Sequence, residues 1–147
     1  MFQLAIIATK IALLGEPTVE GLDPEGVTCL ATNIYHEARG ESLVGQYAVA
    51  YVTLNRVAAE PFPESICDVV YQKKQFSWTA AKGLKIDEPG AYQLALLVAL
   101  TAMTGLGQDP TGGATFYYDH SRVTPNWSRV FKTTAVIGGH TFQTNEG

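Results

Sequence analysis

The chain has 147 residues, of which 46% are hydrophobic, 10% aromatic and 16% charged, and its formal net charge is −4. A charged content this far below the ~25% typical of globular domains, with ample apolar residues, excludes a disordered chain and argues against a coiled coil. The acidic balance and the lack of any Lys/Arg run argue against nucleic-acid binding, which needs a basic surface to neutralise phosphates. We expect one domain with its own core, and a monomer.

The chain opens with an apolar segment, Phe2–Leu14, which Lys10 interrupts. This segment lacks a basic start and a small-residue cleavage site, and it is too short to span a bilayer. We therefore expect residues 1–22 to form a short helix, docked on the core, and a linker, with no export signal and no stable membrane insertion.

Two helices are predicted in the first half of the chain. Asp23-Pro24 has the pattern of an N-cap followed by proline at the first helical position, and apolar residues recur at helical spacing up to about Gly40. Ser42 is a suitable cap for a second helix, whose apolar stripe continues until the proline-containing break at residues 60–63.

The rest of the chain is predicted to add a helical turn, a further helix and a small sheet. A helical turn is predicted over residues 64–71 and a buried helix over residues 89–104, where an acidic residue and a proline again precede the apolar run. Residues 114–118 are typical of a strand, and residues 133–144 of a hairpin around Gly138-Gly139. The expected fold class is α+β, mainly α, with a small sheet in the C-terminal part.

Cys29 and Cys67 are the only cysteines. Their separation fits neither a zinc knuckle nor a C-x-x-C redox motif. Buried free thiols are the expected state, and a disulfide is expected only if the protein reaches an oxidising compartment.

Glu37 has an unusual position on the first predicted helix. It lies about 20° from Leu30 around the helix axis, at the border of the apolar stripe rather than on the solvated face. A half-buried carboxyl in the last turn of a helix has its pKa raised both by desolvation and by the helix dipole, unless Arg39 turns toward it. A carboxyl that keeps its proton near neutral pH suits a general acid. The alternative is a surface Glu paired with Arg39 or a lysine.

Several short motifs follow one another along the chain. They are Tyr35-His36-Glu37-Ala38-Arg39-Gly40-Glu41, Gly45-Gln46-x-Ala48-Val49-Ala50, Leu54-Asn55-Arg56-Val57, Val70-Tyr71-Gln72, Gln75-Phe76-Ser77-Trp78, Asp109-Pro110-Thr111-Gly112-Gly113-Ala114 and Gly139-His140-Thr141-Phe142. In this order, over residues 27–143, they resemble the signature of the cell-wall hydrolase family typified by the spore cortex-lytic enzyme. His36 departs from the family pattern, so no role for its imidazole follows from the resemblance.

The resemblance implies a lysozyme-like single catalytic domain, residues 1–147, that cuts the glycan strands of peptidoglycan between N-acetylmuramic acid and N-acetylglucosamine. The Glu that matches Glu37 is the catalytic acid in that family. Members studied as lytic transglycosylases form a 1,6-anhydromuramic end with one carboxyl group. We expect no metal and no cofactor. A hydrolytic muramidase would use a second carboxylate, for which Glu41 is the nearest candidate. Otherwise Glu41 serves as a cap or salt bridge that holds its loop.

Aromatic and polar residues in the later motifs are candidates for the walls of a sugar cleft, because sugars offer apolar faces to rings and hydroxyls to polar side chains. Each of them, taken singly, is also an ordinary packing residue. The candidates are Gln75, Phe76, Ser77, Trp78, Tyr117, Tyr118, Asn126 and Trp127.

The chain lacks the export signal and the wall-binding repeats of spore-cortex members, and in this it looks like a bacteriophage endolysin. Such a protein would lyse bacteria from within, staying in the host cytoplasm until membrane lesions release it to the periplasm and wall.

Two other classes compete with the glycosidase. A zinc peptidase or amidase is suggested by His36-Glu37, Asp119, His120 and His140, but Gly40 stands where an H-E-x-x-H motif needs its second histidine. A non-catalytic peptidoglycan-binding module is the other alternative, and the ordered set of motifs argues against it.

Overall fold

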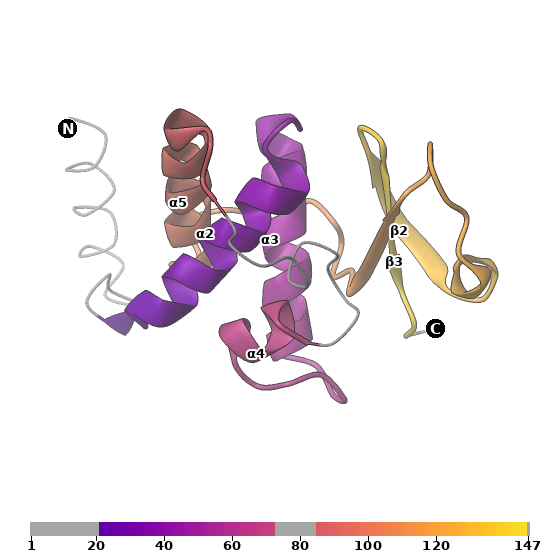
Figure 1. The fold of residues 1–147 in the computed structure, drawn as a ribbon. Helices are drawn as coiled ribbons and strands as arrows, with labels where there is room; N and C mark the ends of the chain where they lie inside the picture. Colours follow the sequence, from indigo (N-terminus) through magenta and orange to yellow (C-terminus); the bar gives the residue numbers. More distant parts are fainter. Residues whose placement is uncertain (1–20, 73–84, 147) are drawn as a thin grey trace.

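The computed structural model describes residues 21–72 and 85–146. Three longer helices gather on one side of the molecule and a small sheet lies on the other, next to α3 (Figure 1). The elements, in chain order, are α2 (Pro24–Ala38), α3 (Leu43–Val57), α4 (Ile66–Val70), α5 (Pro89–Met103), β1 (Phe116–Asp119), the 3-10 helix η3 (Asn126–Arg129), β2 (Lys132–Ile137) and β3 (His140–Thr144).

Helix α2 begins where its sequence predicts. The Asp23 carboxylate accepts hydrogen bonds from the backbone N–H of Glu25 and of Gly26, at 3.1 and 3.2 Å, and Pro24 opens the first turn. One face of the helix is buried in the main core against α3 and α5; this core consists of Leu30, Ala31, Ile34, Tyr35, Ala50, Ala95, Val98, Ala99 and Ala102.

Helices α3 and α5 also agree with the predictions. Ser42 Oγ accepts from the backbone N–H of Gly45 at 3.2 Å, which caps α3. Helix α5 ends at Met103, followed by Gly105 at a φ of +76°, a conformation that glycine adopts without steric cost. Its buried residues include Val98 and Ala99, as expected of a core helix. Over residues 21–72 and 85–146, no helix combines the length and the hydropathy that a bilayer crossing requires.

The sheet has three antiparallel strands in the order β1-β3-β2. The predicted hairpin is confirmed as β2 and β3, and Gly138 in its turn has a φ of +56°. On the face toward α3, Phe142 packs with Ala48, Val52 and Ala114. This second core fixes the sheet against α3.

The predicted strand at residues 114–118 starts later than expected, at Phe116. The segment before it folds around the Asp109 carboxylate, which accepts hydrogen bonds from Asn55, Thr111 and Gly113. Because these bonds hold the segment in a turn, Ala114 is buried against α3 instead of joining the ladder.

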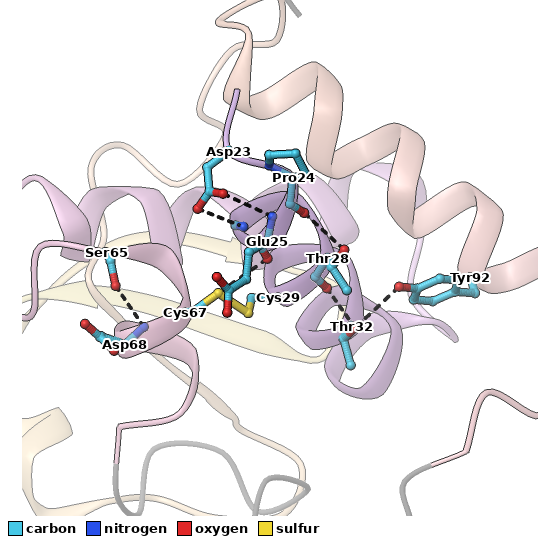
Figure 2. Close-up of a disulfide and its surroundings, with 11 residues drawn as sticks. Asp23, Pro24, Glu25, Thr28, Cys29, Thr32, Ser65, Cys67, Asp68 and Tyr92 are labelled. Carbon is cyan, nitrogen blue, oxygen red and sulfur yellow. Dashed lines mark hydrogen bonds between the residues drawn. A yellow bond between two sulfur atoms is a disulfide. The ribbon is translucent and has the colours of Figure 1, made fainter. Parts of the chain in front are cut away.

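Cys29 and Cys67 form a disulfide, with their Cα atoms 5.3 Å apart (Figure 2). The expectation of buried free thiols is therefore wrong. The bridge joins α2 to the short helix α4, which Ser65 caps through a hydrogen bond to the backbone N–H of Asp68. The 38-residue separation in sequence gave no hint of this, because only the packing of α4 on α2 brings the two thiols together.

Candidate active site

Glu37 lies in the last turn of α2, and its side chain is half-buried. The Tyr117 hydroxyl, from strand β1, donates a hydrogen bond to Glu37 Oε2 at 3.3 Å. Burial raises the pKa of the Glu37 carboxyl, and the bond from Tyr117 opposes this in part. The carboxyl is thus shielded enough to favour its protonated form and yet accessible, as a proton donor requires.

Arg39 does not pair with Glu37. Its Nε lies 2.8 Å from Oε2 of Glu88, and its guanidinium stacks over the Tyr35 ring at 4.7 Å from the centroid. The interpretation of Glu37 as a surface residue neutralised by Arg39 is therefore wrong.

Tyr117, a residue of strand β1, faces α2 and packs against its neighbours on β3. Its ring stacks on Phe142, with centroids 5.6 Å apart, and meets the edge of His140 at 5.3 Å. Burial, together with the nearby Glu37 charge, raises the pKa of Tyr117 well above its usual value. The hydroxyl therefore stays protonated and acts toward Glu37 as a donor.

Glu41 follows the end of α2, and its backbone N–H bonds to the Ala38 carbonyl at 2.9 Å. Its carboxylate reaches the β2–β3 hairpin, where Oε1 lies 3.3 Å from Nδ1 of the buried His140. Glu41 thus connects the loop after α2 to the sheet. This contact is of the loop-holding kind considered above for Glu41.

Arg56 is a buried residue of this region to which the sequence analysis gave no role. Its Nε donates to the Thr115 carbonyl at 2.6 Å, and its guanidinium lies over the rings of Phe62 and Phe116, at 5.1 and 5.4 Å. Burial lowers its pKa to about 10. The available signal was an arginine one heptad after the buried Val49, on the same face of α3.

Tyr118, Asn126 and Trp127 are not brought to Glu37. Successive residues of a strand point to opposite faces of a sheet, so Tyr118 points away from the side where Tyr117 meets Glu37. On this opposite face, the Tyr118 ring contacts Trp127, with centroids 5.6 Å apart, in an aromatic cluster with Phe116 and Phe131. Asn126 is exposed beside this cluster. The other predicted sugar-binding residues, Gln75, Phe76, Ser77 and Trp78, lie outside the described residues, as does the predicted helix at 2–14.

The three histidines have separate surroundings. His36 packs edge-on against Tyr35, His120 Nδ1 lies 2.9 Å from Thr141 Oγ1, and His140 faces Glu41. Across the two described stretches, no three His, Cys, Asp or Glu side chains cluster in a way that could hold a metal ion.

A pocket of about 310 Å³ lies elsewhere, between α3, α5 and the loop that follows α5. It contains none of the predicted site residues. Its lining consists of Val44, Tyr47, Thr101, Leu106, Gly107, Gln108 and Pro110.

Comparison with known proteins identifies the family of this chain. The family model described as Cell Wall Hydrolase matches residues 40–143, so the chain belongs to the cell wall hydrolase family. The matched stretch begins just after Glu37, so the match itself does not include that residue.

Relatives of known structure share the fold. The catalytic domain of the germination-specific lytic transglycosylase SleB from Bacillus anthracis superimposes with a TM-score of 0.70 at 30% identity, covering 84% of this chain and 98% of that domain. The catalytic domain of Bacillus cereus SleB gives the same TM-score at 31% identity, covering 84% of this chain and 93% of that one. The predicted lysozyme-like, mainly helical fold is confirmed.

Curated relatives carry the name spore cortex-lytic enzyme. The one from Halalkalibacterium halodurans is 34% identical over 83% of this chain, and the one from Bacillus cereus is 30% identical over 87%. The chain spans only 36% and 48% of the lengths of these two proteins. The phage endolysin interpretation receives no support from these names and stays a prediction.

Proposed function

We propose that this chain cleaves the glycan strands of peptidoglycan between N-acetylmuramic acid and N-acetylglucosamine by lytic transglycosylation, with Glu37 as the catalytic acid and base. The observation that carries the proposal is the half-buried Glu37 carboxyl with a raised pKa, which meets the Tyr117 hydroxyl and no cation among the described residues. The name of the SleB neighbour, a lytic transglycosylase, supports this chemistry.

The proposed reaction needs one carboxyl group. Glu37 gives its proton to the oxygen that links the two sugars, and the bond from that oxygen to C1 of the muramic residue breaks. The resulting Glu37 carboxylate takes the proton of the C6 hydroxyl of the same muramic residue, and O6 bonds to C1. Glu37 ends protonated, the product carries a 1,6-anhydro ring, and no water is consumed.

Tyr117 has a direct part in this proposal. Its hydroxyl stabilises the Glu37 carboxylate that forms after the first proton transfer, because hydrogen bonds to a charged acceptor are stronger than those to a neutral one. Gln75, Phe76, Ser77 and Trp78 stay predicted sugar-binding residues.

A hydrolytic muramidase is the runner-up. It would need a second carboxylate to activate water or to attack the sugar, and Glu41 is the candidate. The contact of Glu41 with His140 favours a holding role instead. A peptidoglycan-binding module without activity is the alternative from another class.

The test is the Glu37→Gln variant, which keeps the size of the side chain and removes the acid. We expect the variant to fold, to bind purified sacculi and to release no soluble fragments. Mass spectrometry of the wild-type products identifies the chemistry, since anhydro ends indicate transglycosylation and reducing ends indicate hydrolysis. Wild-type protein that binds sacculi and releases nothing would contradict the enzyme and favour the binding module.

The setting of the activity is a separate proposal. An endolysin would act on the wall of a host cell only after membrane lesions release it from the cytoplasm. Cell fractionation during host lysis tests this, and activity at the wall of living, unlysed cells would contradict it.

A further inference from the structure

We propose that Glu41 and His140 are a positioning pair for the proposed reaction, which acts through Tyr117 to hold the hydroxyl on Glu37. This inference rests on the proposed function, because it assigns Glu41 to the support of the acid rather than to the chemistry.

The first contact joins the loop after α2 to the sheet. Glu41 Oε1 lies 3.3 Å from Nδ1 of His140, whose side chain is buried. A carboxylate this close to Nδ1 favours the ring form with its proton on that nitrogen, as an outer carboxylate does for a metal-bound histidine. Across the ladder, a second acidic residue, Asp119, is paired in register with His140.

The second contact is between the His140 ring and the Tyr117 ring, and through it the position of His140 affects that of Tyr117. The His140 and Tyr117 rings meet nearly at right angles, 87° between planes, and Phe142 stacks on the Tyr117 ring at 30°. His140 and Phe142 themselves lie side by side, with ring centroids 6.2 Å apart. Tyr117 thus contacts two neighbouring side chains of β3, and it also packs against the buried Cys29 and Val70. Edge-to-face aromatic pairs of this kind have a preferred geometry, so a displaced His140 ring would displace Tyr117.

The third contact reaches the acid. The Tyr117 hydroxyl is 3.3 Å from Glu37 Oε2, near the long end of the hydrogen-bond range, so a small movement of the ring breaks the bond. Glu41 and Glu37 lie four residues apart on either side of the end of α2, and the sheet residues His140 and Tyr117 bridge them. The four side chains make one connected path, Glu41–His140–Tyr117–Glu37.

Four variants of the full chain separate positioning from catalysis. Glu41→Ala removes the acceptor, and we expect kcat/KM on soluble glycan fragments to fall on the order of 10-fold, mostly in kcat, since a misplaced catalytic group costs up to about 100-fold. Glu41→Gln keeps a carbonyl oxygen that can still accept from Nδ1–H, so it should recover most of the activity. His140→Phe should match Glu41→Ala, and the double variant should be no worse than either single one.

The pH profile provides a readout that simple destabilisation would not move. The hydrogen bond from Tyr117 lowers the pKa of Glu37, so weakening this bond should raise that pKa. The alkaline limb of kcat/KM should therefore move to higher pH in Glu41→Ala and in Tyr117→Phe alike. Glu64→Gln, which changes an exposed acid that is not part of this path, is the matched control and should keep the wild-type profile.

A spectroscopic measurement that needs no His140 variant keeps the proposal testable if His140→Phe fails to fold. Nitrogen NMR of the His140 ring in the wild type should show the proton on Nδ1, and in Glu41→Ala this preference should weaken. A proton on Nε2 in the wild type would overturn the positioning pair.

The outcomes distinguish the two proposals. If Glu41→Gln is as inactive as Glu37→Gln, Glu41 is a second catalytic carboxylate and the positioning role is wrong. If Glu41→Ala keeps the wild-type activity and pH profile while Glu37→Gln is inactive, the pair is wrong and the proposed function stands. If Glu37→Gln stays active, the proposed function fails, and only the NMR result then bears on the pair.

Discussion

The Tyr117 hydroxyl donates to Oε2 of Glu37 across the junction of sheet and helix, at 3.3 Å. Two opposing influences meet at this carboxyl. Burial raises its pKa and makes it a proton donor, while the bond from Tyr117 lowers it and stabilises the carboxylate. An acid that must first give a proton and then take one back needs both forms to be accessible.

Removal of the Tyr117 hydroxyl should shift the pH dependence of the reaction. In Tyr117→Phe the influence that lowers the Glu37 pKa is lost, so that pKa rises further. The protonated form is the active one, so the alkaline limb of kcat/KM should move to higher pH, with a lower maximal rate. Steady-state kinetics on glycan fragments across pH check this, and an unmoved or down-shifted limb would contradict it.

Glu37 should reduce stability at neutral pH. A carboxyl whose pKa is higher in the folded than in the unfolded state stabilises the fold only while it stays protonated. This contribution is present below the unfolded-state pKa and is lost as the pH rises through the folded-state value. Glu37→Gln should therefore melt at a higher temperature than the wild type near pH 7, with the difference vanishing at low pH. Thermal unfolding at several pH values measures this, with Glu64→Gln as the control.

Arg56 should be important for the stability of the sheet junction. Arg56→Met keeps much of the packing on Phe62 and Phe116 but leaves the buried Thr115 carbonyl without its 2.6 Å bond. Such a loss costs about 1–3 kcal/mol in the free energy of unfolding. Arg122→Met, which removes an exposed pair with Asp119, should cost much less, because water screens such a pair. Urea unfolding compares the two, and equal midpoints would contradict the prediction.

The Cys29–Cys67 bridge should stabilise the fold by limiting the unfolded chain. A loop closed over a separation of 38 residues falls in the range where a disulfide contributes about 2–4 kcal/mol. The double variant Cys29→Ser and Cys67→Ser should therefore unfold at lower urea than the oxidised wild type, and should be insensitive to reductant. Identical midpoints for oxidised and reduced wild type would show that the bridge does not form.

Local patterns predicted the helices well because their signals are local. The cap at Asp23 with Pro24, the cap at Ser42, and the apolar run after Pro89 each act through neighbours in sequence. The strand at 114–118 was predicted less accurately, because the turn before it depends on Asn55 of α3 reaching Asp109. Such a bond between distant residues has no periodic signature.

In the candidate site, too, local features were predictable from the sequence and contacts between distant residues were not. The position of Glu37 on the apolar border of its helix follows from helical geometry, and its burial agrees with that prediction. The placement of Tyr118 and Trp127 on the far face of the sheet did not follow, since motif order does not say which face of a strand borders the acid.

The sequence by itself determined the helices, the hairpin and the semi-buried setting of Glu37, because spacing along one helix or one turn is enough to specify each. It also carried the cell-wall hydrolase resemblance, through the order of several motifs along residues 27–143. Only the tertiary structure decided which side chain each of these residues contacts. Glu37 accepts a hydrogen bond from Tyr117, Glu41 lies beside His140, Arg39 pairs with Glu88, and Cys29 forms a disulfide with Cys67. Each pair joins two elements, and which elements meet depends on the packing of the whole core.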